Sequence, residues 1–252
     1  MVFRLDADQN GIGSIRRAVS EGLVTNIPCP NLAAYETACE ELLQGKAKAG
    51  DTVILDTLSM MMTTVLGELK LGSEAKPLGP AIRRLMANDD RGSAYKDSAQ
   101  SIMRWLRFLR NQEINIITLS HEKEIIDQMT GLRKYGPNHN ADLYSSLNAS
   151  SSDMFRLKVL LEDEVDEEGR VVRPAFSRVL QLRPDAESMA KYHTDFGDEA
   201  GMPRELSNPT LPRLYKAIKG RPEWLAIYGA PGVGKTTFAC SEVLTTTKEK
   251  NA

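Results

Sequence analysis

One short motif near the end of the chain restricts the possible folds more than any other feature. Residues 229–236 read Gly-Ala-Pro-Gly-Val-Gly-Lys-Thr, a complete G-x-x-x-x-G-K-[ST] pattern. The preceding WLAIY predicts a buried strand, and the following KTTFACSEVL predicts a helix. Glycines in such a turn let successive backbone N–H groups point at phosphate oxygens. The alternative is a chance glycine turn before a helix, but the complete pattern in this context favours a phosphate-binding loop.

The motif also assigns a role to its individual side chains. Lys235 is predicted to reach the β- and γ-phosphates of a nucleotide, and Thr236 to place its hydroxyl on Mg²⁺. The residues predicted to surround the phosphates are Gly229, Ala230, Pro231, Gly232, Val233, Gly234, Lys235, Thr236 and Thr237.

A second segment supplies the acidic group that such a site requires. The residues TVILDT predict a buried strand over Thr52 to Leu55 that ends at Asp56. An aspartate at the tip of a neighbouring strand is the usual partner for the magnesium ion of a phosphate-binding loop. The alternative is an aspartate that only caps the following helix. We predict that Asp56 and Thr236 hold the metal together.

Composition limits the class of protein. The chain has 252 residues, a formal net charge of −2 and three cysteines. The charge balance predicts no general attraction to nucleic acid, so any contact with DNA needs a local basic patch. The three cysteines favour a reducing compartment without structural disulfides. No signal peptide and no apolar run of membrane-spanning length is found, which predicts a cytoplasmic protein without a membrane segment.

Strands alternate with helices along most of the chain. Strands are predicted at 2–8, 52–55, 114–120 and 223–229, and an amphipathic helix at 95–112. This alternation predicts an α/β fold with a mostly parallel, doubly wound sheet. A hairpin over 155–183 is predicted to add an antiparallel edge. Loops are predicted at 73–95, around a short helix, and at 130–152, where apolar residues are few.

The position of the glycine motif after all other elements is unusual. Joining the end of the chain to its start gives an unbroken order of strand, phosphate-binding loop, helix and then the strand VFRLDAD. We therefore expect a single domain over 1–252 with circularly permuted termini, in which 222–252 supply the loop, its strand and its helix. Close termini at the surface make such a rearrangement tolerable. The alternative is that the last 30 residues begin a second domain.

In rotated order the chain resembles the RecA-like P-loop NTPases, and most closely the phage single-strand annealing ATPases of that superfamily. The segments that carry the resemblance are YGAPGVGKTTFA, LDAD, DTVILDTLS, NIITLSHEKE with TGLRKYGP, and MPRELSNPTLPRLYKAIKG. In rotated order the resemblance extends over nearly the whole chain. The resemblance implies binding of ATP with Mg²⁺, slow ATP hydrolysis, and self-association into a ring or filament.

The resemblance implies further site residues. Asp8, with Asp6 as the nearby competitor, stands where the family carries an acid that polarises the attacking water. The family usually has glutamate there, so a shorter side chain must do this work. His121 stands where the family has a polar sensor of the γ-phosphate, and Glu122 is the weaker candidate. Lys191 and His193 in AKYHTDF stand where a neighbouring subunit would insert basic residues, and the alternative is a solvated surface.

Contact with single-stranded DNA is expected on the segment GLRKYGPNHN. Arg133 and Lys134 could meet phosphates and Tyr135 could stack on a base, with His139 nearby. The alternative is a solvated basic loop. The sequence thus predicts an ATP-dependent protein that binds single-stranded DNA in phage-type recombination. Two other functions stay open: a KaiC-like nucleotide-dependent switch that binds a protein partner, and a kinase of nucleotides or other small molecules.

Overall fold

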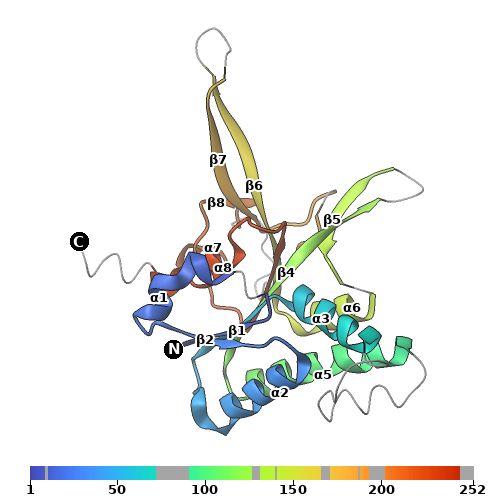
Figure 1. The fold of residues 1–252 in the computed structure, drawn as a ribbon. Helices are drawn as coiled ribbons and strands as arrows, with labels where there is room; N and C mark the ends of the chain where they lie inside the picture. Colours follow the sequence, from blue (N-terminus) through green and yellow to red (C-terminus); the bar gives the residue numbers. More distant parts are fainter. Residues whose placement is uncertain are drawn as a thin grey trace.

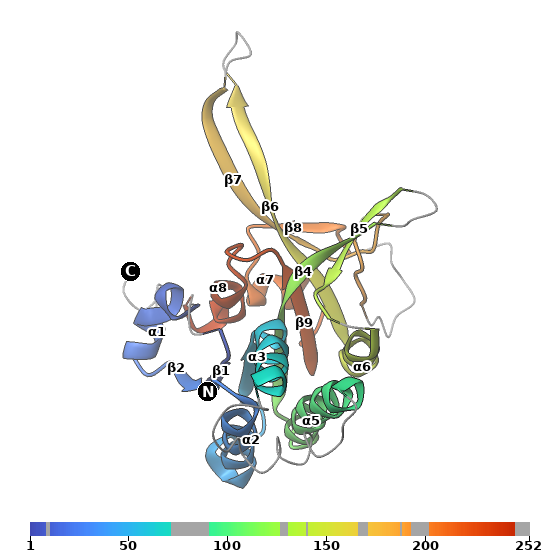
Figure 2. The same ribbon diagram turned by 45° about the vertical axis from the view of Figure 1, so that its right-hand side comes forward.

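The computed structural model describes residues 1–8, 11–71, 91–126, 131–139, 141–165, 171–186, 188–192 and 202–244. These residues form an α/β structure built on a mixed sheet of nine strands, with helices on both faces (Figures 1 and 2). The strands are β1 Val2–Asp6, β2 Val24–Pro28, β3 Thr52–Asp56, β4 Asn115–Ile126, β5 Arg133–Pro137, β6 Asp153–Val165, β7 Val171–Gln181, β8 Glu205–Ser207 and β9 Trp224–Gly229. The helices are η1 Gly11–Ile15, α1 Arg16–Ser20, α2 Leu32–Glu41, η2 Leu42–Lys46, α3 Leu58–Leu71, α5 Arg91–Asn111, α6 Ala141–Ser150, α7 Leu211–Ala217 and α8 Lys235–Ala239.

The sheet is parallel through its centre. Its order is β2-β1-β3-β4-β9-β6-β7-β8, and the pairings from β2 to β6 are all parallel. β7 and β8 continue the sheet in antiparallel pairing, and β5 pairs antiparallel with the far half of β4. The predicted α/β class with a mostly parallel sheet is therefore confirmed. Continuous apolar runs such as that of β3 suit a strand covered on both faces.

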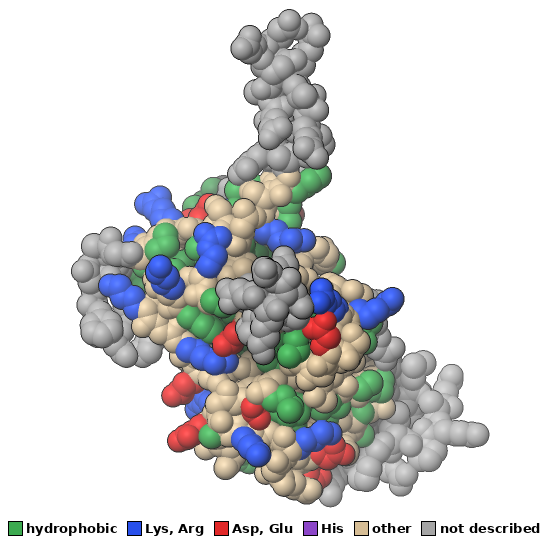
Figure 3. All heavy atoms as spheres, turned by 90° about the vertical axis from the view of Figure 1, so that its left-hand side faces the viewer, with side chains coloured by type: hydrophobic (Ala, Val, Ile, Leu, Met, Phe, Trp, Pro, Cys, Tyr) green, Lys and Arg blue, Asp and Glu red, His purple; other side chains and the backbone are tan. Residues whose placement is uncertain are grey.

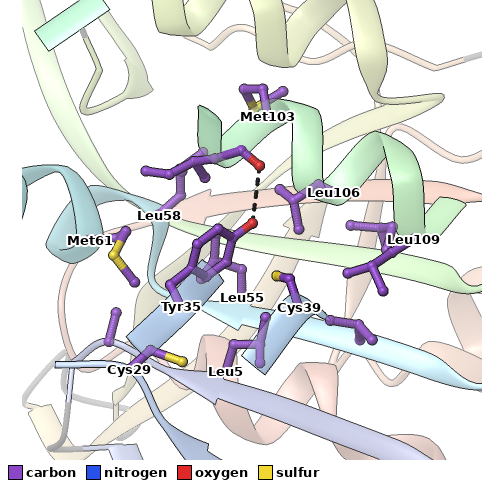
Figure 4. Close-up of a cluster of buried hydrophobic side chains, with 14 of the residues drawn as sticks. Leu5, Cys29, Tyr35, Cys39, Leu55, Leu58, Met61, Met103, Leu106 and Leu109 are labelled. Atoms are coloured by element: carbon purple, nitrogen blue, oxygen red, sulfur yellow. Dashed lines mark hydrogen bonds between the residues drawn. The ribbon is translucent and has the colours of Figure 1, made fainter. Parts of the chain in front are cut away.

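Two apolar clusters cover the two faces of the sheet. The larger lies under α2, α3, α5 and α6, and the smaller lies under α1, α7 and α8. In the larger cluster, Tyr35 of α2 is fully buried and its hydroxyl donates to the Ile102 carbonyl of α5 at 3.0 Å (Figure 4). Leu106 and Leu109 of α5 point into the same cluster at helical spacing. This packing covers the face of the sheet opposite to the one on which α8 lies.

β9 lies inside the sheet, between β4 and β6, although it follows every other described strand in chain order. Both neighbours run past the end of β9. Gly229 is level with His121 in the middle of β4, and Tyr228 is level with Arg156 near the start of β6. The extensions form the β4–β5 hairpin and the β6–β7 hairpin, which project from the same edge of the sheet (Figure 2).

Two segments predicted to be loops form regular structure in at least part of their described residues. The loop predicted over 130–152 is wrong for its described part, because this segment forms β5 and α6. The few apolar residues of this segment are enough to anchor α6 on the core, because Leu143 and Leu147 lie one helical turn apart and are both fully buried. The loop predicted over 73–95 lies mostly outside the described residues, but α5 already begins at Arg91. Within the described ranges, every helix is too short or too polar to cross a membrane.

Candidate functional site

The glycine motif follows β9 directly and its backbone has the form that the sequence predicts. Gly232 and Gly234 have φ angles of +80° and +92°, a region that side chains with a Cβ rarely adopt. At Gly229 a Cβ atom would lie 2.2 Å from the Leu157 carbonyl oxygen of β6. Only glycine therefore lets β9 and β6 lie this close where the loop begins.

Lys235, the first residue of α8, is folded back over the loop. Its ammonium group donates to the carbonyl oxygens of Gly229 at 3.0 Å and Ala230 at 2.9 Å. Burial lowers the pKa of Lys235, and the carboxylates of Asp56, Glu122 and Asp8 act in the opposite direction. The ammonium group is thus held at the loop by weak carbonyl partners, which a phosphate oxygen could replace with a charge-assisted bond.

Thr236 and Asp56 meet as the sequence predicts. The Thr236 hydroxyl donates to Oδ2 of Asp56 at 2.6 Å, across 180 residues of chain. Asp56 is the last residue of β3 and is almost fully buried. The two oxygen donors lie side by side at the carboxyl ends of parallel strands, where ligands of open α/β sheets bind.

A buried arginine that the sequence analysis did not identify donates a hydrogen bond to the Asp56 carboxylate. Arg4 of β1 is fully buried, and its Nε donates to Asp56 Oδ2 at 2.8 Å. Its Nη1 lies 2.7 Å from Asp6 Oδ2 and donates to the Asn26 side chain at 2.7 Å. Asp6, the competitor for the water-orienting role, is therefore buried and paired with Arg4. Its place in a strand gives Arg4 little local signal, because only Asp6 lies on β1, whereas Asp56 and Asn26 come from other strands.

Asp8 and His121 lie on the wall of one cavity with the loop. This cavity has a volume of about 470 Å³ and is also lined by Asp56, Lys235 and Thr236. The backbone N–H of Asp8 donates to the Asp56 carbonyl at 3.2 Å, which holds the end of β1 beside β3. The structure therefore brings together the predicted residues Asp8, Asp56, His121, Lys235 and Thr236.

His121 sits on β4, level with Gly229, and is half-buried. Its backbone N–H donates to the Ser59 hydroxyl at 3.0 Å. Burial and the Lys235 ammonium lower the pKa of His121, while Asp8 and Asp56 raise it less. The imidazole is therefore mostly neutral at pH 7 and can donate one hydrogen bond into the cavity.

Arg178 of β7 is a second lining residue that the sequence analysis missed. Its Nε donates to the Val233 carbonyl of the loop at 3.0 Å. The guanidinium group lies against Gly234, where a Cβ atom would be 2.9 Å from Nε. Arg178 lies within the hairpin predicted over 155–183, but one arginine on a strand, 55 residues before Val233, carries no spacing signal. Only the pairing of β6, β7 and β9 brings it to the loop.

The residues predicted to contact DNA lie outside this cavity, on β5. Arg133 is exposed and pairs with Glu124 of β4 at 3.2 Å, and Lys134 follows it on the strand. The ring of Tyr135 is covered on one face by the Arg156 guanidinium, 3.9 Å from its centroid. His139 does not join this group as expected, because it is almost fully buried against Ser120.

The remaining predicted residues lie apart from the cavity or outside the described part. Glu122 pairs with Arg156 at 2.9 Å. The Lys191 ammonium group donates to the carbonyl oxygens of Ser151, at 2.8 Å, and Asn148, at the end of α6. His193 lies outside the described residues.

The donor set fits a magnesium-bound triphosphate. Thr236 and Asp56 offer the oxygen ligands that Mg²⁺ prefers, and this ion usually takes only one or two protein ligands beside phosphate oxygens and water. Among the described residues, no three His, Cys, Asp or Glu side chains gather into a group that could hold a metal ion. The Gly232 and Gly234 backbone offers the conformation that aims N–H groups at an anion.

Comparison with protein-family models and with curated proteins gives no match to this chain.

Proposed function

We propose that this chain is an ATPase with a RecA-like P-loop fold that binds single-stranded DNA. The observation that carries the proposal is the meeting of Lys235, Thr236, Asp56, Asp8 and His121 on one cavity. These residues come from four separate stretches of the chain, and their side chains are the set that phosphoryl transfer to water requires.

In the proposed reaction, a water oxygen attacks the γ-phosphorus in line, and the bond to the bridging oxygen of the β-phosphate breaks. Asp8 orients the water and accepts its proton. Lys235 leaves the Gly229 and Ala230 carbonyls and stabilises the charge on the phosphate oxygens. Mg²⁺, held by Thr236 and Asp56, would supply further positive charge. His121 donates a hydrogen bond to the γ-phosphate while its ring is neutral.

The sheet order supports the RecA-like interpretation with a rotated chain. The strand before the loop, β9, pairs with β4 and β6 in the same sheet as Asp56 of β3. The chain order that the resemblance implies, from the loop and α8 onward to β1, requires α8 to lie near the start of the chain. α8 packs against η1, the first helical segment after β1.

The proposed DNA contact lies on the β4–β5 hairpin. Strand β4 runs from the cavity at His121 directly into this hairpin, which carries Arg133, Lys134 and Tyr135. A change at the γ-phosphate therefore has a short covalent path to the basic strand. A KaiC-like switch would use the same path to contact a protein partner.

The test is ATP hydrolysis measured with and without single-stranded oligonucleotides. We expect slow hydrolysis that DNA stimulates, and DNA binding that weakens steeply as salt rises. Lys235→Ala should lower the rate on the order of 10²- to 10³-fold. The control Lys46→Ala removes an exposed lysine that pairs with Glu41, and it should keep the rate. No hydrolysis by the wild type would exclude the ATPase, and hydrolysis without any DNA binding would favour the protein-binding switch.

A further inference from the structure

A second cavity adjoins the one already described. It has a volume of about 590 Å³ and lies between α1, α8 and the turn at 208–210. Gly234, Thr237 and Arg178 line both cavities. A single ligand can therefore extend from the phosphate-binding loop into the second cavity past these three residues.

The lining of the second cavity suits the nucleoside half of a nucleotide. Leu157, Pro209 and Phe238 supply apolar surface, and Asn208 and Thr210 supply polar groups. Small-molecule sites commonly have a volume of ~300–1,000 Å³ and this mixture of mostly apolar walls with few polar groups.

Arg178 stands at the junction of the two cavities. Its Nε–H···O bond to Val233 fixes the guanidinium plane against Gly234. Within the described part of the chain this is the one hydrogen bond found for the Arg178 side chain. The Nη groups are therefore available to an anion, and guanidinium is the side chain best shaped for phosphate.

The charge on this side of the molecule agrees with an anionic ligand. Figure 3 shows the face that carries α1 and α8, with Lys and Arg side chains gathered over its upper half below the β6–β7 hairpin. Acidic side chains are more frequent in its lower half.

We propose that Arg178 binds the α-phosphate of the nucleotide from within the same subunit, while the nucleoside occupies the second cavity. This inference rests on the proposed function and adds a phosphate ligand outside the glycine motif. Because Arg178 belongs to β7, the bound nucleotide also tethers the β6–β7 hairpin to the loop.

The test is calorimetric titration of ATP, ADP and inorganic triphosphate into the wild type, Arg178→Gln, Arg178→Lys and Lys158→Gln. Loss of a charge-assisted hydrogen bond should weaken ATP and ADP binding about 10- to 100-fold in Arg178→Gln. Lysine keeps the charge but not the planar fork, so Arg178→Lys should recover part of the affinity. Lys158 lies in the same hairpin, pairs with Glu205 of β8 and lines neither cavity, so its variant should bind like the wild type.

Two results would overturn the inference while the proposed function survives. One is equal ATP affinity of the wild type and Arg178→Gln. The other is inorganic triphosphate binding the wild type as tightly as ATP, which would leave the second cavity without a nucleoside. Thermal unfolding without nucleotide should give Arg178→Gln and the wild type similar midpoints. Weaker binding by the variant could then not be explained by a loss of its folded structure. Failure of the wild type to bind any nucleotide would instead remove the proposed function itself.

Discussion

The two hairpins that flank β9 both extend a strand of the central sheet, but they contact the rest of the molecule in different ways. Each extends a strand that pairs with β9, and both project from the edge of the sheet at which the glycine motif lies (Figure 2). The β6–β7 hairpin contacts the motif directly, through Arg178 on Val233 and through the Leu157 carbonyl against Gly229. The β4–β5 hairpin is tied at its base to β6, where Arg156 pairs with Glu122 and covers Tyr135.

Because their contacts differ, we expect the β6–β7 and β4–β5 hairpins to have different roles. Arg178 joins the β6–β7 hairpin to the loop, so a ligand bound at the loop is expected to affect this hairpin by direct contact. The β4–β5 hairpin is held by an ion pair beside the cavity, so the expected route to it is β4, which carries His121 and Glu122 in succession. We therefore expect the β6–β7 hairpin to govern nucleotide affinity and the β4–β5 hairpin to govern the response to nucleotide.

The largest effect is expected from Gly229 of β9, which lies against Leu157 at the base of the β6–β7 hairpin. In Gly229→Ala the new Cβ would meet a backbone carbonyl at 2.2 Å, so β9 and β6 must separate. We expect a loss of about 3 kcal/mol or more in the free energy of unfolding. In Gly136→Ala on β5 the nearest atom is the Met189 sulfur at 3.1 Å, on a flexible side chain. Its cost should stay within about 1 kcal/mol. Urea unfolding of both variants checks this, and equal losses would contradict the tighter attachment of β6–β7.

The next effect concerns the ion pair of each hairpin. Arg156 and Glu122 have side chains only 10% and 17% exposed, whereas Lys158 and Glu205 are 23% and 40% exposed. Glu122→Gln leaves the Arg156 charge without its partner and should cost about 2 kcal/mol, below the value for a fully buried pair. Lys158→Gln should cost less than about 1 kcal/mol. A double-mutant cycle with Arg156→Gln measures the coupling. A coupling near zero would mean that Glu122 does not tie the β4–β5 hairpin to β6.

The smallest effect is a dependence on pH that arises at His139, two residues after β5 of the β4–β5 hairpin. Burial, with Lys123 nearby, lowers the pKa of His139 to about 3, while an unfolded chain has a histidine pKa of ~6.5. Between these values the unfolded state binds more protons, so stability is complete above pH 6.5 and falls as the pH decreases. His139 should contribute a loss of about 1 kcal/mol between pH 6.5 and 5.5, and about 1.4 kcal/mol per pH unit further below.

His139→Gln should remove most of this slope, and thermal unfolding at several pH values measures it. The lowered pKa of His121 leaves a smaller slope of the same sign. The β6–β7 hairpin contains no histidine, so variants within it should keep the wild-type slope. An unchanged slope in His139→Gln would contradict the buried, neutral state of this ring.

The sequence was sufficient to predict candidate-site residues that belong to a local pattern. It was insufficient for residues whose place in the site depends on a partner far away in the chain. Asp56 and the glycine motif were predicted because each follows a recognisable buried strand. Arg4 and Arg178 were missed because a single arginine in a strand has no signature until its partners are known. The α6 helix was missed because two buried leucines in a polar segment are too few to show a period.

The interior position of β9 has a consequence for how the protein is made. A ribosome delivers β4 and β6 well before β9, so during synthesis the edges that will face each other stay without their shared neighbour. Open strand edges are templates for pairing with other chains. The segment that carries the glycine motif thus also fills the gap in the sheet, and the nascent protein is protected from such pairing only once the candidate site is complete.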